Sequence, residues 1–143
     1  MSAASPTLPA QPHDIELITL EKLHERVRAL RETGHRLVQI SVTPLPETFE
    51  LTYSFDFSGS LASLRLQVPR DIPALPSISP IFGAAVLYEN EIHDLFGITI
   101  DNMTIDFRGN FYKTAIKYPM TTKMTPPAAP KPVPKAAAKP AAQ

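Results

Sequence analysis

The sequence predicts an α+β fold in which a small antiparallel sheet of three to four strands carries helices on one face. Three stretches place an apolar residue at every second position, which is typical of strands with one buried face. Two stretches place apolar residues at every third or fourth position, which is typical of helices. With 143 residues, the chain is expected to form a single domain.

The three strands are predicted over residues 38–42, 49–57 and 64–68. Ser58-Gly59-Ser60 forms a short turn between the last two, which therefore pair as an antiparallel hairpin. A further short strand is expected over residues 98–100. Four prolines make residues 69–80 a stiff connection into the second helix.

The first helix is predicted over about residues 19–33, and Gly34 ends it. The second is predicted over residues 80–96, with Ser79 as its cap, Pro80 at its first position and Gly97 at its end. Three acids crowd the C-terminal half of this second helix: Glu89, Glu91 and Asp94. The helix dipole disfavours an acid there by about 0.3–1 kcal/mol. Such acids mark a functional site, or basic residues elsewhere in the fold neutralise them.

Composition divides the chain into three parts. Residues 1–13 are rich in proline and small polar residues and are expected to form a flexible arm, while residues 14–120 carry the pattern of a folded domain. Residues 121–143 are mostly Pro, Ala and Lys, so we expect a disordered tail. This tail is a spacer, or alternatively a tether to a partner or to an acidic membrane surface.

Composition also argues against several classes of protein. The chain has no cysteine, so it offers no ligand for an iron–sulfur cluster or a thiolate metal site. Its net charge is zero, which gives no basic field for nucleic acid. No apolar run approaches the ~18 residues that span a bilayer, and we expect no signal peptide at the N-terminus.

An active site in the second helix is disfavoured by the spacing of its polar residues. Asn90 stands three residues before His93, so neither a di-iron Glu-x-x-His motif nor a zinc-protease motif is present. At about 100° per residue, Glu89 and His93 share one flank of the helix, while Glu91 and Asp94 share the other. The two flanks are better suited as docking edges, where acids bind arginines of a second protein.

Residues 89–98, Glu-Asn-Glu-Ile-His-Asp-Leu-Phe-Gly-Ile, resemble the signature of the C subunit of the NADH:quinone oxidoreductases (complex I). The same module occurs in membrane-bound energy-converting nickel–iron hydrogenases. The resemblance is tight over these residues and looser over residues 15–118. It implies a structural subunit without catalytic activity that packs against the large catalytic subunit of a redox complex. The residues expected to dock are Glu89, Glu91, His93, Asp94, Phe96 and Gly97.

Two departures from the complex I pattern make the chain more similar to the corresponding subunit of energy-converting (Ech-type) hydrogenases. Asn90 replaces the basic residue common between the two glutamates, and no His-Pro and paired-Arg segment follows Ile98. The resemblance then implies an assembly that oxidises ferredoxin, reduces protons and pumps ions. Its nickel–iron centre and iron–sulfur clusters would lie in partner subunits, and this chain would bind no cofactor. It would be peripheral, on the cytoplasmic side of the membrane.

Three alternatives stay open. The chain could be a component of a NADH/quinone oxidoreductase, a freestanding binding module with a Pro-rich ligand tail, or a small metal-dependent enzyme that uses Glu89 and His93. We hypothesise that Glu91 and Asp94 are partly exposed and bind basic groups of the catalytic subunit. A rival hypothesis pairs them internally with Arg65, Arg108 or Lys113.

The irregular segment after residue 100 carries apolar residues that are expected to pack partly on a neighbouring protein: Ile105, Phe107, Phe111, Tyr112 and Tyr118.

Overall fold

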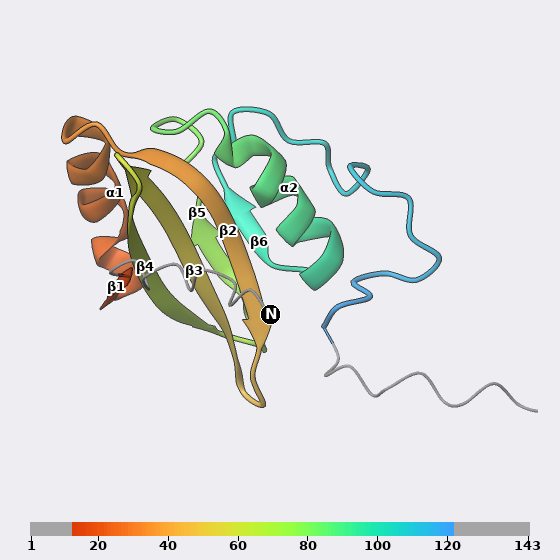
Figure 1. The fold of residues 1–143 in the computed structure, drawn as a ribbon. Coiled ribbons are helices and arrows are strands. Elements are labelled where there is room, and N and C mark those ends of the chain that lie inside the picture. The colour runs from red at the N-terminus through yellow and green to blue at the C-terminus, as the bar shows by residue number, and fades with distance from the viewer. Residues whose placement is uncertain (1–12, 122–143) are drawn as a thin grey trace, which may run out of the picture.

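The computed structural model describes residues 13–121, so all but Thr121 of the predicted tail and all but His13 of the predicted arm lie outside the described residues. A four-stranded sheet in the order β1-β4-β3-β2 forms one layer. Two helices cover one of its faces, with a two-stranded sheet beside them (Figure 1). The α+β class predicted from the sequence is therefore confirmed.

The central strands agree with the sequence pattern. β2 (Arg36–Pro44), β3 (Thr48–Phe57) and β4 (Ser60–Pro69) pair antiparallel. Between β3 and β4 the two turn residues, Ser58 and Gly59, have φ of 50° and 83°, as expected for the tight turn of a hairpin. Alternate side chains of β3 face the helices and are buried: Phe49, Leu51, Tyr53 and Phe55.

Strand β1 (His13–Leu17) was not predicted, and His13 belongs to it rather than to the flexible arm. β1 pairs parallel with β4, so the sheet is mixed rather than purely antiparallel. All its residues are exposed. Such a strand carries no alternation of buried and exposed positions, because it is held by backbone pairing to a strand almost fifty residues away.

The second sheet pairs β5 (Ala74–Pro76) with β6 (Thr99–Asp101) in parallel. The strand expected over residues 98–100 is confirmed as β6. β5 lies inside the proline-rich stretch that was predicted to be only a connection. A strand this short tolerates proline at its end, since Pro76 is its last residue.

The first predicted helix is confirmed, with a tighter first turn. A 3-10 turn, η1 (Leu20–Lys22), leads into α1 (Leu23–Glu32), and Gly34 follows with φ of 86°. Leu23 and Val27 point from α1 into the core and are fully buried. The core is a single cluster that joins α1, the inner face of the sheet and α2.

The second helix is shorter than predicted. α2 runs over Ala85–Phe96. The residues from Pro80 to Ala84, which were predicted to begin the helix, form non-helical turns instead. The predicted cap was wrong, because the Ser79 hydroxyl accepts a hydrogen bond from the Thr104 amide on a different segment. The predicted end is confirmed: Gly97 has φ of 71°, and its amide donates to His93 O.

After β6 the chain runs without regular secondary structure along the outer side of α2 (Figure 1). We call residues 102–121 the strap. Its far end is tied back to the body of the protein, because the Met120 amide donates to Leu95 O and Arg70 donates to both Leu45 O and Thr121 O. The strap and α2 therefore form one continuous surface.

Candidate docking surface

The polar residues of α2 point in three directions, and Glu89 points inward. Its side chain is 0% exposed. One carboxylate oxygen accepts the Ile78 amide at 2.7 Å, and the other accepts the Ser77 hydroxyl at 2.5 Å. Glu89 thus holds the turn between β5 and α2. The prediction that Glu89 lies on an exposed docking edge is not met in this structure, because the side chain is buried.

Burial sets the proton affinity of Glu89. It raises the pKa of the Glu89 carboxyl, and the hydrogen bonds from Ser77 and Ile78 only partly oppose this effect. The neighbouring Tyr53 hydroxyl is buried without a hydrogen-bond partner among the described residues. Burial and the charge of Glu89 both raise the pKa of Tyr53. The contacts of Glu89 therefore lie in the interior of the subunit.

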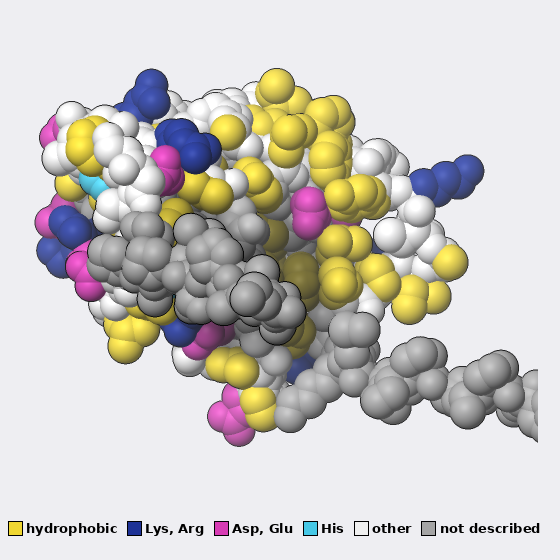
Figure 2. All heavy atoms as spheres, viewed as in Figure 1, with side chains coloured by type: hydrophobic (Ala, Val, Ile, Leu, Met, Phe, Trp, Pro, Cys, Tyr) yellow, Lys and Arg dark blue, Asp and Glu magenta, His cyan; other side chains and the backbone are white. Residues whose placement is uncertain are grey.

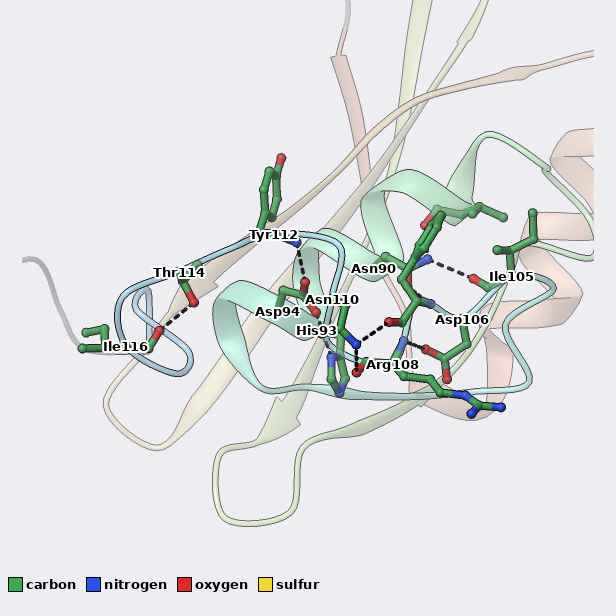
Figure 3. Close-up of polar contacts among 12 residues, drawn as sticks. Asn90, His93, Asp94, Ile105, Asp106, Arg108, Asn110, Tyr112, Thr114 and Ile116 are labelled. Carbon is green, nitrogen blue, oxygen red and sulfur yellow. Dashed lines mark hydrogen bonds and ion pairs between the residues drawn. The ribbon is translucent and has the colours of Figure 1, made fainter.

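Asn90 and Asp94 lie one turn apart on the flank of α2 that faces the strap (Figure 3). Asn90 is 1% exposed, and its amide nitrogen donates to Ile105 O at 2.9 Å while its oxygen accepts the Phe107 amide at 3.0 Å. Asp94 is 6% exposed and accepts the Tyr112 amide at 2.7 Å. These two side chains anchor the strap to the helix.

The hypothesis of two partly exposed acids is therefore half right. Glu91 is half-buried and accepts a hydrogen bond from the Tyr112 hydroxyl at 3.1 Å, which raises the pKa of Tyr112. The expected exposure of Asp94 was wrong, because its carboxylate caps a backbone amide of the strap. Among the described residues neither acid pairs with Arg108 or with the other bases of the rival hypothesis.

His93, Phe96 and Gly97 complete the predicted set. His93 Nδ1 lies 3.2 Å from a carboxylate oxygen of Asp94, and the imidazole stands edge-on to the ring of Tyr118. Phe96 is half-buried, with its ring edge-on to Phe49. A Cβ at Gly97 would lie 2.9 Å from the ring of Tyr118, so this glycine meets both a conformational and a steric need.

Sequence reasoning missed the roles of Asn90 and of the strap. In the sequence, Asn90 stands out only as a departure from the family pattern. Its spacing of four residues from Asp94 places both on one flank of α2, and this spacing is the signal that could have found it. The backbone groups that the pair binds belong to residues 105–112, far along the chain.

A polar cleft of about 330 Å³ opens between α2 and the strap. It is lined by His93, Asp94, Arg108, Gly109, Asn110, Tyr112, Thr114, Lys117 and Tyr118. Within residues 13–121, no three His, Asp or Glu side chains come together as a set that could hold a metal ion. No helix in that range has the length and hydrophobicity needed to cross a bilayer.

Apolar side chains gather over α2 and the strap (Figure 2). Leu87 on the outer face of α2 is 57% exposed, and Ile105 and Ile116 on the strap are 54% and 65% exposed. Phe107, Tyr112, Tyr118 and Met120 are also exposed. An apolar surface of this kind, rimmed by polar residues, is typical of a protein interface.

Comparison with known proteins identifies the family. Residues 17–128 match the family described as "Respiratory-chain NADH dehydrogenase, 30 Kd subunit". The chain belongs to this family. Membership of the 30 Kd subunit family confirms the resemblance drawn from residues 89–98.

Two curated members of the family come from two strains of Thermus thermophilus. One is named as subunit 5 and the other as the C subunit of NADH-quinone oxidoreductase, and each is 35% identical to this chain over 65 residues. The match covers 41% of this chain and 31% of each relative. The matched region therefore spans about a third of the length of these relatives.

Two solved structures share the fold. One is in the membrane-bound sulfane sulfur reductase (MBS), an archaeal respiratory membrane complex, with a TM-score of 0.62, 22% identity, and coverage of 71% of this chain and 65% of the other. The second is the trypsin-resistant fragment (1-134) of Nqo5, with a TM-score of 0.55, 27% identity, and coverage of 62% and 78%.

Proposed function

We propose that the chain is a structural subunit, without catalytic activity of its own, of a membrane-associated redox complex, and that it docks onto the large catalytic subunit. The observation that carries this proposal is the match to the 30 Kd subunit family over residues 17–128. Members of that family are named as components of NADH-quinone oxidoreductases, and a solved relative in fold belongs to a respiratory membrane complex.

The surface proposed for docking is the outer side of α2 together with the strap. Glu91 and His93 are the half-buried polar groups of the predicted docking set on this surface, and exposed apolar residues such as Leu87 surround them. Glu89 and Asp94 support the surface from below. They hold the turn before α2 and the strap in place through buried hydrogen bonds.

Within this proposal, the assembly is an energy-converting hydrogenase that oxidises ferredoxin, reduces protons and moves ions across the membrane. Support comes from the sequence after Ile98, which lacks the segment usual in complex I, and from Asn90. In this chain Asn90 anchors the strap, a task that a basic residue at the same place could not perform in the same way.

A second candidate is a component of a NADH/quinone oxidoreductase. The observation that favours it is the 35% identity with the C subunit from Thermus thermophilus. In both cases the nickel–iron centre or iron–sulfur clusters would belong to partner subunits, since this chain has no cysteine ligand. The chain would lie on the cytoplasmic side of the membrane through its partners.

Purification of the tagged full chain from its native membranes tests the proposal. Co-isolation of a hydrogenase large subunit with ferredoxin-dependent hydrogen evolution supports the first candidate, and co-isolation of quinone-reducing subunits supports the second. Isolation of the chain without any partner subunit under mild detergent contradicts both candidates.

Elemental analysis of the isolated chain is expected to find no stoichiometric nickel, iron or zinc after chelation. Such a metal would contradict the proposal that the subunit binds no cofactor.

A matched pair of variants tests the docking surface. Glu91→Gln is expected to weaken assembly, by roughly 2–5 kcal/mol if the acid becomes buried against a base of the partner. Glu32→Gln removes an exposed acid at the end of α1, outside the docking surface, and should leave assembly unchanged. Both variants should unfold within about 0.5 kcal/mol of the natural chain. If the two variants assemble equally well, Glu91 does not contribute to docking.

A further inference from the structure

Charge is divided unevenly along the chain. All 14 acidic residues lie at or before Asp106, whereas seven of the 14 basic residues follow it. Residues 107–143 therefore carry a charge of +7, and residues 1–106 carry −7. The chain as a whole is neutral, but its C-terminal quarter is cationic.

The first three of these bases lie on the strap, in or beside its cleft. Arg108 and Lys117 line the cleft between the strap and α2, while Lys113 and Lys117 line an adjoining hollow of about 520 Å³. All three side chains are exposed. Every Asp and Glu of the chain lies in the described residues, and none of them forms an ion pair with these bases.

Asp94, the acid that lines the cleft, forms no ion pair with Arg108 or Lys117. One oxygen of Asp94 is occupied by the Tyr112 amide, and the other lies beside His93. The lining of the cleft therefore carries two cations, Arg108 and Lys117, against the single carboxylate of Asp94. Within residues 13–121 neither the Arg108 nor the Lys117 side chain donates a hydrogen bond, so a second carboxylate that entered the cleft could accept from both.

The surroundings of the cleft favour a protein ligand. Exposed Tyr112, Ile116 and Tyr118 stand next to the bases, and aromatic residues beside arginine are typical of the core of protein interfaces. The bases line a concave cleft, whereas an anionic membrane or a nucleic acid backbone binds to a row or face of cations.

We propose that the strap is the docking site for an acidic segment of a partner protein, in which Asp or Glu side chains alternate with apolar residues. One partner carboxylate enters the cleft between Arg108 and Lys117, and the apolar side chains cover Tyr112 and Ile116. This inference rests on the proposed function, because it takes the chain to be a subunit of a larger assembly. It adds the chemistry of the partner segment.

Reassembly of the full-length subunit with a complex purified from cells that lack it tests the site. The double variant Arg108→Gln, Lys117→Gln is expected to bind about ten to a hundred times more weakly at low salt. The control Lys22→Gln, Arg28→Gln removes two exposed bases that lie outside the strap and should bind as the natural chain does. Circular dichroism and urea unfolding of both variants should match the natural chain.

Zero-length carbodiimide coupling gives a direct readout, because it joins a lysine amine to a carboxylate that contacts it. Mass spectrometry is expected to find Lys113 or Lys117 joined to an Asp or Glu of a partner subunit. Equal reassembly of the two double variants, or no such cross-link in the assembled complex, would overturn the inference while leaving the proposed function standing.

Binding to vesicles of phosphatidylglycerol and phosphatidylcholine tests the alternative that the cleft binds a lipid surface. Binding of the full chain to these vesicles that requires Arg108 and Lys117, together with unchanged reassembly, would overturn the acidic segment in favour of a lipid surface. If no redox complex accepts the natural subunit at all, the proposed function fails as well, and the two failures are thereby distinguished.

Discussion

Replacement of Asn90 by leucine is the sharpest test of how α2 holds the strap. The two side chains are similar in size, so the substitution leaves little cavity and mainly removes polar interactions. Asn90 donates to Ile105 O and Val86 O and accepts the Phe107 amide. Val86 O keeps its place in the α2 hydrogen-bond ladder, but the two strap groups lose their partner.

The magnitude follows from the hydrogen bonds that the substitution removes. Each hydrogen bond contributes about 0.5–1.5 kcal/mol net, and a donor or acceptor left buried without a partner costs about 1–3 kcal/mol. The strap can relax toward water, which limits the second effect. We therefore expect Asn90→Leu to lower the free energy of unfolding by about 2–4 kcal/mol, a large part of the roughly 5–15 kcal/mol usual for a domain.

Urea unfolding at 25 °C measures this decrease, and amide hydrogen exchange at Phe107 locates it. Protection of that amide should fall about tenfold for each 1.4 kcal/mol by which local stability decreases. Asn110→Ala is the control, because Asn110 is exposed and bonds only within the strap, at 3.2–3.3 Å. The reasoning would be refuted if Asn90→Leu proved as stable as Asn110→Ala, with Phe107 equally protected.

Three further predictions concern Glu89, Gly97 and the tail. Because burial raises the pKa of Glu89, the native state holds its proton more tightly than the unfolded state, so the free energy of unfolding should fall as the pH rises from the ordinary to the native pKa. Glu89→Gln should abolish this slope in urea titrations across that pH range. Gly97→Ala should cost at least about 1–2 kcal/mol from the left-handed backbone alone, with a further loss that Tyr118→Ala relieves in a double-mutant cycle. Deletion of residues 125–143 should leave the melting temperature of the domain unchanged, since it removes almost no apolar surface that could be buried.

The elements that the sequence predicted correctly are those set by local periodicity. Alternation in β3 and helical spacing in α1 and α2 report which face of each element is buried, whatever that face meets. Gly97 was predictable as the end of α2, because its conformation is a local backbone requirement. The family signature over residues 89–98 was likewise visible in the sequence alone.

Elements held by distant backbone pairing were missed. β1 and β5 are short, exposed or proline-containing, and each exists because a remote strand completes its hydrogen bonds. The start of α2 was misplaced for a related reason. Ser79 had the composition of a helix cap, but its hydroxyl is engaged by Thr104 on the strap.

The sequence by itself determined the α+β class, the positions of the main helices and strands, the absence of cysteine ligands and the membership of the 30 Kd subunit family. The tertiary structure alone decided the direction of each polar residue on α2. Glu89 turned inward to Ser77 and Ile78, and Asp94 turned to the strap. The physical reason is that a polar side chain becomes buried only where the fold brings it a hydrogen-bond partner, and these partners lie 11 to 18 residues away in the chain.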